Sequence, residues 1–457
     1  MTSRYRWLIA VPTLSAALLG QQCRGQLTYQ LGNTLLDIDV VLDSTRVNIP
    51  WEILWGPDDK LWMTDGPLIT RWDPVTDVVD TLMDRGRGNG LGMALHPDFP
   101  NTPIVMAVFD TADYYAGGQL CEVGRFIYDA ANDTITDETV LFTYYHAGEH
   151  AAGRVLFDTT GNVLVTTPDY YLNGPDTLWS MVGKTLRFST DGSVPLDNPR
   201  TDYTWTWGHR NAQGLAMLPN GAIITSEHGM APWGNEINMI EGNHYYGWPA
   251  FDGDQCSSII PDSCTSLTFS YTHALATFPQ PPSGTEFYTS DLIPELHDKL
   301  ITCVLWQRGL KLYSFTNELD SITAQEYLDG GAFDVMWRNR DIAIRPDGTF
   351  YLITNDRGDA RIRWVHPDIN TGVSSVTRQG FSIAPNPVEG ILSITLDPGI
   401  DPITVTTLDA EGRTVYSGTP TKYGPTMIDT RNWSDGLYTV RLTHAHGIGV
   451  QRFVKSR

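Results

Sequence analysis

Short apolar runs alternate with turn residues over most of the chain. The clearest unit is an apolar run, a turn of Pro, Asp, Asn or Gly, and a second apolar run that ends near threonine. Four copies are WEILWGPDDKLWMTD from Trp51, GRVLFDTTGNVLVTTPD from Gly153, GLAMLPNGAIITSEH from Gly214 and RDIAIRPDGTFYLITND from Arg340. The turn residues allow the positive φ angles of a tight connection, and Val, Ile, Leu and aromatic side chains suit a pleated, buried surface. Each unit is therefore predicted to be a β-hairpin.

Two degenerate copies, from Leu91 and from His297, bring the number of units to six. Repetition at a spacing of roughly 50 residues is typical of propeller blades, and closure into a ring removes exposed sheet edges. We therefore expect an all-β protein whose main part, residues 27–368, is a six-bladed β-propeller. The alternative is a β-sandwich with similar hairpins.

The two ends of the chain differ from the repeats. Residues 1–25 carry Arg4 and Arg6 before an apolar stretch too short to span a bilayer, which predicts a removable secretion signal. No other run is long and apolar enough for a transmembrane segment. Residues 369–380 are polar and are predicted to be a linker, and the short alternating strands of residues 381–457 predict a small immunoglobulin-like β-sandwich.

The charge and the cysteines limit the partners and the compartment. The 457 residues carry a formal net charge of -22, which argues against nucleic acid or an anionic membrane as partner and favours cations. The same charge also serves solubility alone. Four cysteines remain after the predicted signal. Cys256 and Cys264 are close enough in sequence to clip one loop in an oxidising compartment, while the pairing of Cys121 with Cys303 stays open.

The C-terminal segment carries a distinctive set of motifs. It begins with Pro-Asn-Pro, continues with an Asp-x-x-Gly-Arg turn and a Gly-Leu-Tyr strand, and ends in a basic tail. In these features it resembles the C-terminal sorting domain of the type IX secretion system of Bacteroidetes. The resemblance implies export across both membranes by that machinery to the cell surface or beyond, with Gly436, Tyr438 and Lys455 in recognition. An adhesive or carbohydrate-binding sandwich is the competing interpretation.

Polar clusters at the ends of the predicted blade strands are the candidates for chemistry, because propeller loops converge at one end of the central channel. His150 stands at the entrance of one strand, with Glu149 beside it and Asp169 at the end of the next strand. An imidazole held by a carboxylate can accept a proton from a hydroxyl group. A surface or core histidine is the alternative for His150 taken alone.

Arginines precede two further blade strands. Arg210 and Asn211 lie in WGHRNAQGLA, and Arg338 and Arg340 alternate in WRNRDIAIRPDG, where they are expected to share one strand face. Guanidinium groups bind carboxylates through paired hydrogen bonds, so these positions indicate an anionic ligand. Ordinary solvation is the alternative for each arginine singly.

The segment SEHGMAPWGNEINMIEGNHYYGWP combines a glycine-rich backbone with Asn235, Glu236 and Tyr246. Backbone carbonyl, carboxylate and amide oxygens are the ligands that calcium prefers. The segment therefore predicts a calcium site, with a hydrogen-bonded blade connection as the alternative.

In combination, these clusters resemble the soluble quinoprotein glucose and sorbosone dehydrogenase family, whose six-bladed propellers bind pyrroloquinoline quinone (PQQ) and calcium. The matching stretches run from about Pro50 to Asp356. They are PWEILWGPDDKLWMTD, LGMALHPDF, HAAGRVLF with Asp169, GKTLRFSTDGSVPLDNP, WGHRNAQGLA, SEHG with NEINMI, YYGWP and WRNRDIAIRPDG.

The resemblance implies roles residue by residue. His150 would be the base and Asp169 would orient it. The cofactor would be held by Arg210, Asn211, Arg338 and Arg340, and by Gln307, which stands where the family has lysine. The backbone oxygens of Gly229 and Met230 would bind one calcium, and Asn235, Glu236 and Tyr246 would contribute to a second. Arg87 stands near the position where the family offers a glutamine to the substrate.

The sequence thus leads to the expectation of a secreted PQQ- and calcium-dependent dehydrogenase that oxidises a sugar or related small alcohol and passes electrons to an external acceptor. No CxxCH haem motif is present in the sequence. Two alternatives remain: a noncatalytic propeller that binds ligands at the cell surface, and a calcium-dependent lactonase-type hydrolase.

Overall fold

A computed structural model describes residues 27–111, 120–146, 148, 150–170, 177–230, 232–260, 263–265, 270–306, 309–329, 338–356, 359–367, 381–396, 402–409, 413–421, 424–444 and 447–456. These residues form β-strands and one short 3-10 helix, Ser263–Thr265, which confirms the all-β prediction. The predicted signal (1–25) and linker (369–380) lie outside the described residues. None of the described helices has the length and apolarity needed to cross a membrane.

Five antiparallel four-stranded sheets follow one another along the chain. The first contains β3 (Pro50–Trp55), β4 (Leu61–Asp65), β5 (Leu68–Asp73) and β6 (Val78–Asp84). The second contains β7 (Asn89–Leu95), β8 (Ile104–Asp110), β9 (Leu120–Asp129) and β10 (Thr134–Tyr145). The third contains β11 (Val155–Phe157), β12 (Val163–Thr167), β13 (Lys184–Phe188) and β14 (Thr204–Trp207). The fourth contains β15 (Ala212–Met217), β16 (Ile223–Glu227), β17 (Asn235–Ile240) and β20 (Ala276–Phe278). The fifth contains β21 (Pro282–Tyr288), β22 (Lys299–Val304), β23 (Leu310–Phe315) and β24 (Ile322–Leu328).

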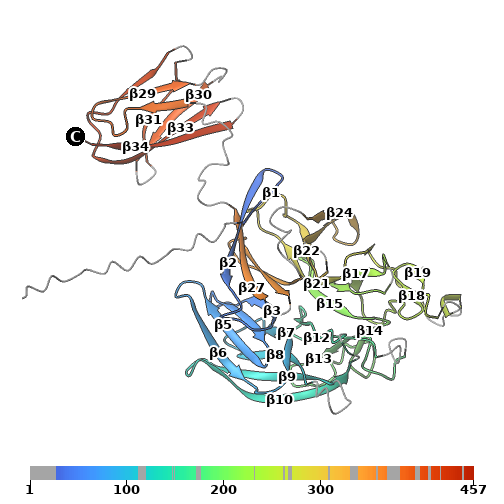
Figure 1. Cartoon of the computed structure of the whole chain (residues 1–457). Coiled ribbons are helices and arrows are strands. Elements are labelled where there is room, and N and C mark those ends of the chain that lie inside the picture. The colour runs from blue at the N-terminus through green and yellow to red at the C-terminus, as the bar shows by residue number, and fades with distance from the viewer. Residues whose placement is uncertain are drawn as a thin grey trace, which may run out of the picture.

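A sixth sheet joins the two ends of this part of the chain. Its strand order is β1 (Leu27–Leu31), β2 (Thr34–Leu42), β27 (Asp359–Pro367), β26 (Phe350–Asp356) and β25 (Asn339–Ile344). The first strands of the six sheets contact one another in a closed cycle: β3, β7, β11, β15, β21, β25 and again β3. The sheets are therefore arranged around a central axis, as in a β-propeller (Figure 1), and pairing of β2 with β27 closes the ring.

The hydrophobic core of the ring lies between neighbouring sheets. Trp62 and Ile69 of the first sheet pack with Met93 and Val105 of the second in one buried cluster. Similar clusters join the second sheet to the third and the sixth to the first. Inner strands such as β4 and β12 are therefore buried along their whole length, whereas the outer strands β6, β10 and β24 are partly exposed and polar.

A buried ion-pair cluster connects the innermost strands. The Arg154 guanidinium, just before β11, lies 2.7 Å from Glu52 of β3 and 2.8 Å from Asp341 of β25. Its Nε donates to the carbonyl of Gln213 in β15 at 2.6 Å. One side chain therefore holds four sheets around the axis.

Two smaller sheets follow residue 380 and enclose one core. They contain β28 (Phe381–Ala384), β29 (Ile391–Leu396) and β32 (Thr426–Asp429), and β31 (Thr414–Gly418), β30 (Pro402–Leu408), β33 (Gly436–His444) and β34 (Gly447–Lys455). Leu392 and Ile428 of the first sheet share a buried cluster with Val405 and Phe453 of the second. Tyr438 is buried in the same cluster.

The structure shows which of the described cysteines are paired. The short strands β18 (Phe251–Asp252) and β19 (Gln255–Cys256) form a two-stranded sheet. Cys256 forms a disulfide with Cys264, which confirms the predicted pairing. Cys121 and Cys303 are free and belong to two different buried clusters, so the pairing left open by the sequence is not formed.

Candidate active site

His150 and Asp169 meet at the end of the ring where the inner strands begin. Nδ1 of His150, which lies before β11, is 3.1 Å from Oδ1 of Asp169, which follows β12. The other carboxylate oxygen of Asp169 accepts from the indole Nε1 of Trp248 at 3.1 Å. Since a carboxylate only accepts, Nδ1 of His150 carries the hydrogen and Nε2 presents a lone pair. The pair therefore has the geometry of an oriented base.

Arg210 lies next to this pair. The backbone N–H of Asp169 donates to the carbonyl of Arg210 at 2.7 Å, and the Arg210 guanidinium is 5.3 Å from the Trp248 ring. Burial lowers the pKa of Arg210, although Asp169, Asp252 and Glu227 oppose the effect. Its buried Nε has no hydrogen-bond partner among the described residues. A partly unsatisfied, buried cation of this kind favours an anionic ligand.

The loop after β16 presents carbonyl groups to Arg210. Nη1 of Arg210 donates to the carbonyls of His228 at 3.1 Å and Gly229 at 3.0 Å. A Cβ on Gly229 would lie 2.1 Å from the carbonyl group of Gly234, so only glycine fits. The exposed Met230 is held by its N–H, which donates to Asp252 at 2.9 Å. The backbone is therefore fixed with convergent oxygens, which is the type of ligand that calcium binds.

His228 is a residue of this region that the sequence analysis did not single out. Its Nε2 donates to the carbonyl of Pro282, and its Nδ1 lies 3.4 Å from Nδ2 of Asn211. Burial, together with the nearby charges of Arg340, Arg210 and His150, lowers the pKa of His228 to about 3. The ring of His228 is therefore neutral. Its position in the SEHG motif was the only signal in the sequence.

Asn211 and Arg340 belong to the same hydrogen-bond network. Oδ1 of Asn211 accepts from the backbone of Ala152 and from Gln213 Nε2, both at 3.2 Å. Gln213 Oε1 accepts in turn from Nη1 of Arg340 at 3.0 Å. The network thus runs from β25 to the segment that bears His150.

Arg338 departs from the sequence prediction. It precedes β25 and has φ of 52°, in the left-handed region, and the pairing register shifts between Asn339 and Asp341. The prediction that Arg338 and Arg340 share one strand face was therefore wrong. The two guanidinium groups are nevertheless close, since the charge of Arg338 contributes, after burial, to lowering the pKa of Arg340 to about 9.

The residues predicted for a second calcium occupy different environments. Asn235 accepts from Gly229 N and donates to Phe278 O, whereas the Tyr246 hydroxyl donates to Met239 O and accepts from Glu241 N. Asn235 and Glu236 are consecutive in β17, so their side chains leave opposite faces. The described structure does not bring the three side chains to one point.

Glu236 is the member of this set with the strongest electrostatic signal. Burial raises its pKa well above the usual range, and the charges of Glu227, Asp252 and Asp254 raise it further. Asn238 donates to Glu236 at 2.8 Å. A buried carboxylate among other carboxylates is stabilised by a proton or a cation.

Three further positions were singled out in the sequence. Gln307 and Glu149 lie outside the described residues. Arg87 lies 3.0 Å from Glu122, with a side chain that is 55% exposed, so its charge is already paired.

Residues from the third to the sixth sheet therefore converge at one end of the ring. They place a proton acceptor, Arg210, Arg340 and a carbonyl-lined loop in one hydrogen-bond network. Such a site can take a proton from a hydroxyl group beside a negatively charged ligand and a divalent cation.

Comparison with known families divides the chain as the fold does. The model described as glucose / sorbosone dehydrogenase matches residues 47–364. The model described as secretion system C-terminal sorting domain matches residues 382–456.

Individual relatives are similar over the ring. Quinoprotein glucose dehydrogenase B of Acinetobacter calcoaceticus is 32% identical over 250 residues, which are 46% of this chain and 52% of that protein, so the match spans about half the length of that relative. An aldose sugar dehydrogenase of Escherichia coli is 27% identical over 346 residues, 70% of this chain and 90% of that protein. The PQQ-bound aldose sugar dehydrogenase of Streptomyces coelicolor superposes with a TM-score of 0.59 at 23% identity, covering 72% of this chain and 98% of that one. That likeness shows the fold.

Proposed function

The chain belongs to the glucose/sorbosone dehydrogenase family, and on that premise we propose that it is a PQQ- and calcium-dependent dehydrogenase that oxidises a sugar or related alcohol. The observation that carries the proposal is one hydrogen-bond network at the end of the ring. Asp169 contacts both His150 and the backbone of Arg210, and Asn211 and Gln213 connect Arg340 to the segment that bears His150. The scaffold is proposed to be a six-bladed propeller with one sheet per blade. An external acceptor receives the electrons.

The cationic side of the site fits PQQ. Arg210 and Arg340 each have a buried Nε without a partner among the described residues, and burial lowers the pKa of both groups. Carboxylates of a bound ligand would satisfy these nitrogens and relieve the mutual repulsion of the arginines. Arg210, Asn211, Arg338 and Arg340 are the residues that would hold the cofactor, with Gln307 as a further contact.

The loop after β16 fits calcium. The carbonyl of Gly229 is fixed by a backbone that tolerates no side chain, and Met230 adjoins it. Of the three residues predicted for a second calcium, only Glu236 is proposed as a cation ligand, because a cation would stabilise its buried carboxylate, whereas Asn235 and Tyr246 bond elsewhere. When bound, PQQ with calcium supplies an electrophilic quinone that accepts a hydride.

His150 is proposed to accept the substrate hydroxyl proton at Nε2. Asp169 holds the imidazole by accepting from Nδ1, and it stabilises the imidazolium that forms. Trp248 fixes Asp169 through the second carboxylate oxygen. The residues of the chain thus supply binding, orientation and the proton acceptor.

Export follows from the C-terminal match. We propose that residues 1–25 are a signal peptide and that residues 381–457 direct the protein through the type IX machinery to the cell surface or beyond. Residues 27–368 would then act outside the cell.

The proposed activity is tested with the full chain after addition of calcium and PQQ. Dye reduction with a panel of aldoses and simple alcohols is expected, and it should require both additions. Lactone hydrolysis without PQQ would instead support a hydrolase, and PQQ-free ligand binding without dye reduction would support a binding module. If His150→Ala reduces the dye as fast as the parent, His150 is not the base.

A further inference from the structure

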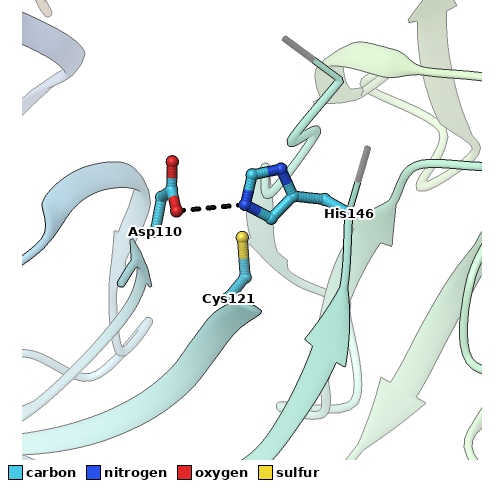
Figure 2. A group of neighbouring side chains, drawn as sticks. All are labelled: Asp110, Cys121 and His146. Atoms are coloured by element: carbon cyan, nitrogen blue, oxygen red, sulfur yellow. Dashed lines mark hydrogen bonds and ion pairs between the residues drawn. The ribbon is translucent and has the colours of Figure 1, made fainter. Parts of the chain in front are cut away.

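A second cluster of chemically active side chains lies in the second sheet, outside the proposed active site. Asp110 ends β8, Cys121 lies near the start of β9, and His146 follows β10 directly. Their carboxylate oxygen, sulfur and ring nitrogen all lie within 4.8 Å of one another. Figure 2 shows the three groups facing a common point.

The geometry distinguishes this cluster from a catalytic triad. Nε2 of His146 is 3.0 Å from Oδ1 of Asp110, and the Cys121 sulfur is directed toward the same nitrogen (Figure 2). In a catalytic triad, the carboxylate and the nucleophile contact opposite nitrogens of the imidazole. Here both converge on one nitrogen, which is the arrangement of ligands around an ion.

Ordinary core packing also leaves the cluster unexplained. His146 is 1% exposed, and its buried Nδ1 has no hydrogen-bond partner among the described residues. Burial raises the pKa of the Cys121 thiol, so the sulfur is protonated in the absence of a metal. The buried imidazole of His146 therefore keeps one nitrogen that the described residues do not satisfy, which core packing alone does not explain.

We propose that Asp110, Cys121 and His146 form a binding site for a borderline-soft divalent metal, with zinc as the preferred ion. Thiolate, imidazole and carboxylate are the zinc ligands of proteins, whereas calcium takes oxygen ligands. Tetrahedral zinc with these ligands needs atoms about 3.4–3.6 Å apart, by the bond lengths of such sites. The Asp110 to His146 separation of 3.0 Å is a hydrogen-bond distance, and it would lengthen by a few tenths of an ångström when an ion replaces the shared hydrogen.

Charge balance supports a divalent ion. On binding, the Cys121 thiol loses its proton to solvent, and the hydrogen of His146 moves from Nε2 to Nδ1. One proton is released per zinc. The thiolate and the Asp110 carboxylate then neutralise the two charges of the ion, so no net charge is buried.

The site would connect the strand ends to the segment that bears His150. His146 is four residues before His150 in the sequence. The hydroxyl of Tyr144 donates to the carbonyl of Ala151 at 3.0 Å and also lies within hydrogen-bond reach of the Cys121 thiol. Zinc would therefore fix β8, β9 and the end of β10 beneath this segment.

The experiment uses the full chain stripped with EDTA and then titrated with Zn²⁺ or with Co²⁺ as the spectroscopic substitute. One zinc per chain is expected by elemental analysis, and cobalt is expected to give a thiolate charge-transfer band in the near ultraviolet. Calcium should not displace either metal. Zinc should raise the Tm of the parent.

Cys121→Ser should abolish the cobalt band and weaken zinc binding at least about tenfold. Cys303→Ser, which alters the other buried free thiol in a different cluster, should behave like the parent. Asp110→Asn keeps the thiol, and it should retain the band with weaker affinity even if the serine variant does not fold. The proposal is overturned if the parent binds no zinc, or if Cys121→Ser or Asp110→Asn binds zinc as tightly as the parent does.

Discussion

Replacing Asp169 by asparagine tests how the proposed base is oriented. Asp169 accepts two hydrogen bonds, from Nδ1 of His150 and from Nε1 of Trp248, each at 3.1 Å. Asparagine offers one oxygen and one NH₂ group. The indole can only donate, so the amide oxygen is expected to face Trp248 and the NH₂ group to face His150. The hydrogen of the imidazole would then move to Nε2 and occupy the proposed acceptor position.

The expected magnitude follows from the loss of a positioned base. General-base catalysis contributes roughly 10²–10⁴-fold, which corresponds to about 2.7–5.5 kcal/mol of activation free energy. The assay is dye reduction by the full chain at saturating PQQ and calcium. We expect kcat to fall by that factor, with PQQ affinity changed much less.

A second histidine–carboxylate pair provides the control. Nε2 of His366 lies 3.1 Å from Asp39 in the sixth sheet, with no contact to the proposed site. Asp39→Asn makes the same chemical change and should leave kcat unaltered. If Asp169→Asn keeps kcat within about twofold of the parent, the tautomer argument and the assignment of His150 are both refuted.

Three further predictions concern stability and the calcium loop. Arg154→Met should lower the free energy of unfolding by about 3–5 kcal/mol, because it leaves Glu52 and Asp341 buried without their partner. In denaturant titrations the exposed Arg431→Met should leave the free energy of unfolding nearly unchanged, and an equally small effect of Arg154→Met would contradict the role given to the buried ion pairs. Burial raises the pKa of Glu286 from 4.5 to about 8, so between these pH values the folded state holds a proton that the unfolded state has lost. The free energy of unfolding of the parent should therefore fall relative to that of Glu286→Gln as the pH rises from 4.5 to 8. If the two free energies change in parallel across that window, the burial argument is wrong. Gly229→Ala should weaken calcium binding at least about tenfold in calorimetric titration, because the Cβ of the alanine would displace the backbone at Gly234. Unchanged calcium affinity would show that this loop does not bind the ion.

Local features of the fold were readable from the sequence, because hairpins depend on neighbouring residues. The units from Trp51 and Gly153 became β3–β4 and β11–β12, each with its turn where Pro, Asp or Gly indicated it. The closure of the ring by β2 and β27 was not readable, since it pairs residues more than 300 positions apart. Cys256 and Cys264 were predictable as a pair because only a short loop separates them.

In the candidate site, too, some features could be predicted from the sequence and others could not. His150 and Asp169 were identified together, and the structure places them in contact. Arg338 was misplaced because a left-handed residue and a register shift interrupt the strand alternation on which the prediction rested. His228 was missed because its importance lies in its neighbours from other sheets. The Asp110, Cys121 and His146 cluster was missed for another reason, because its members come from three strands of one sheet and match no metal-binding motif.

The most direct test of the central claim is a titration of the full chain with PQQ at saturating calcium, followed by the absorbance of protein-bound quinone. The predicted result is saturation at one quinone per chain, lost without calcium and at least about tenfold weaker in Arg340→Gln, because a carboxylate of the quinone would lose its guanidinium partner. Absence of saturable binding, or equal affinity in the parent and Arg340→Gln, would contradict a single pocket built from the converging arginines.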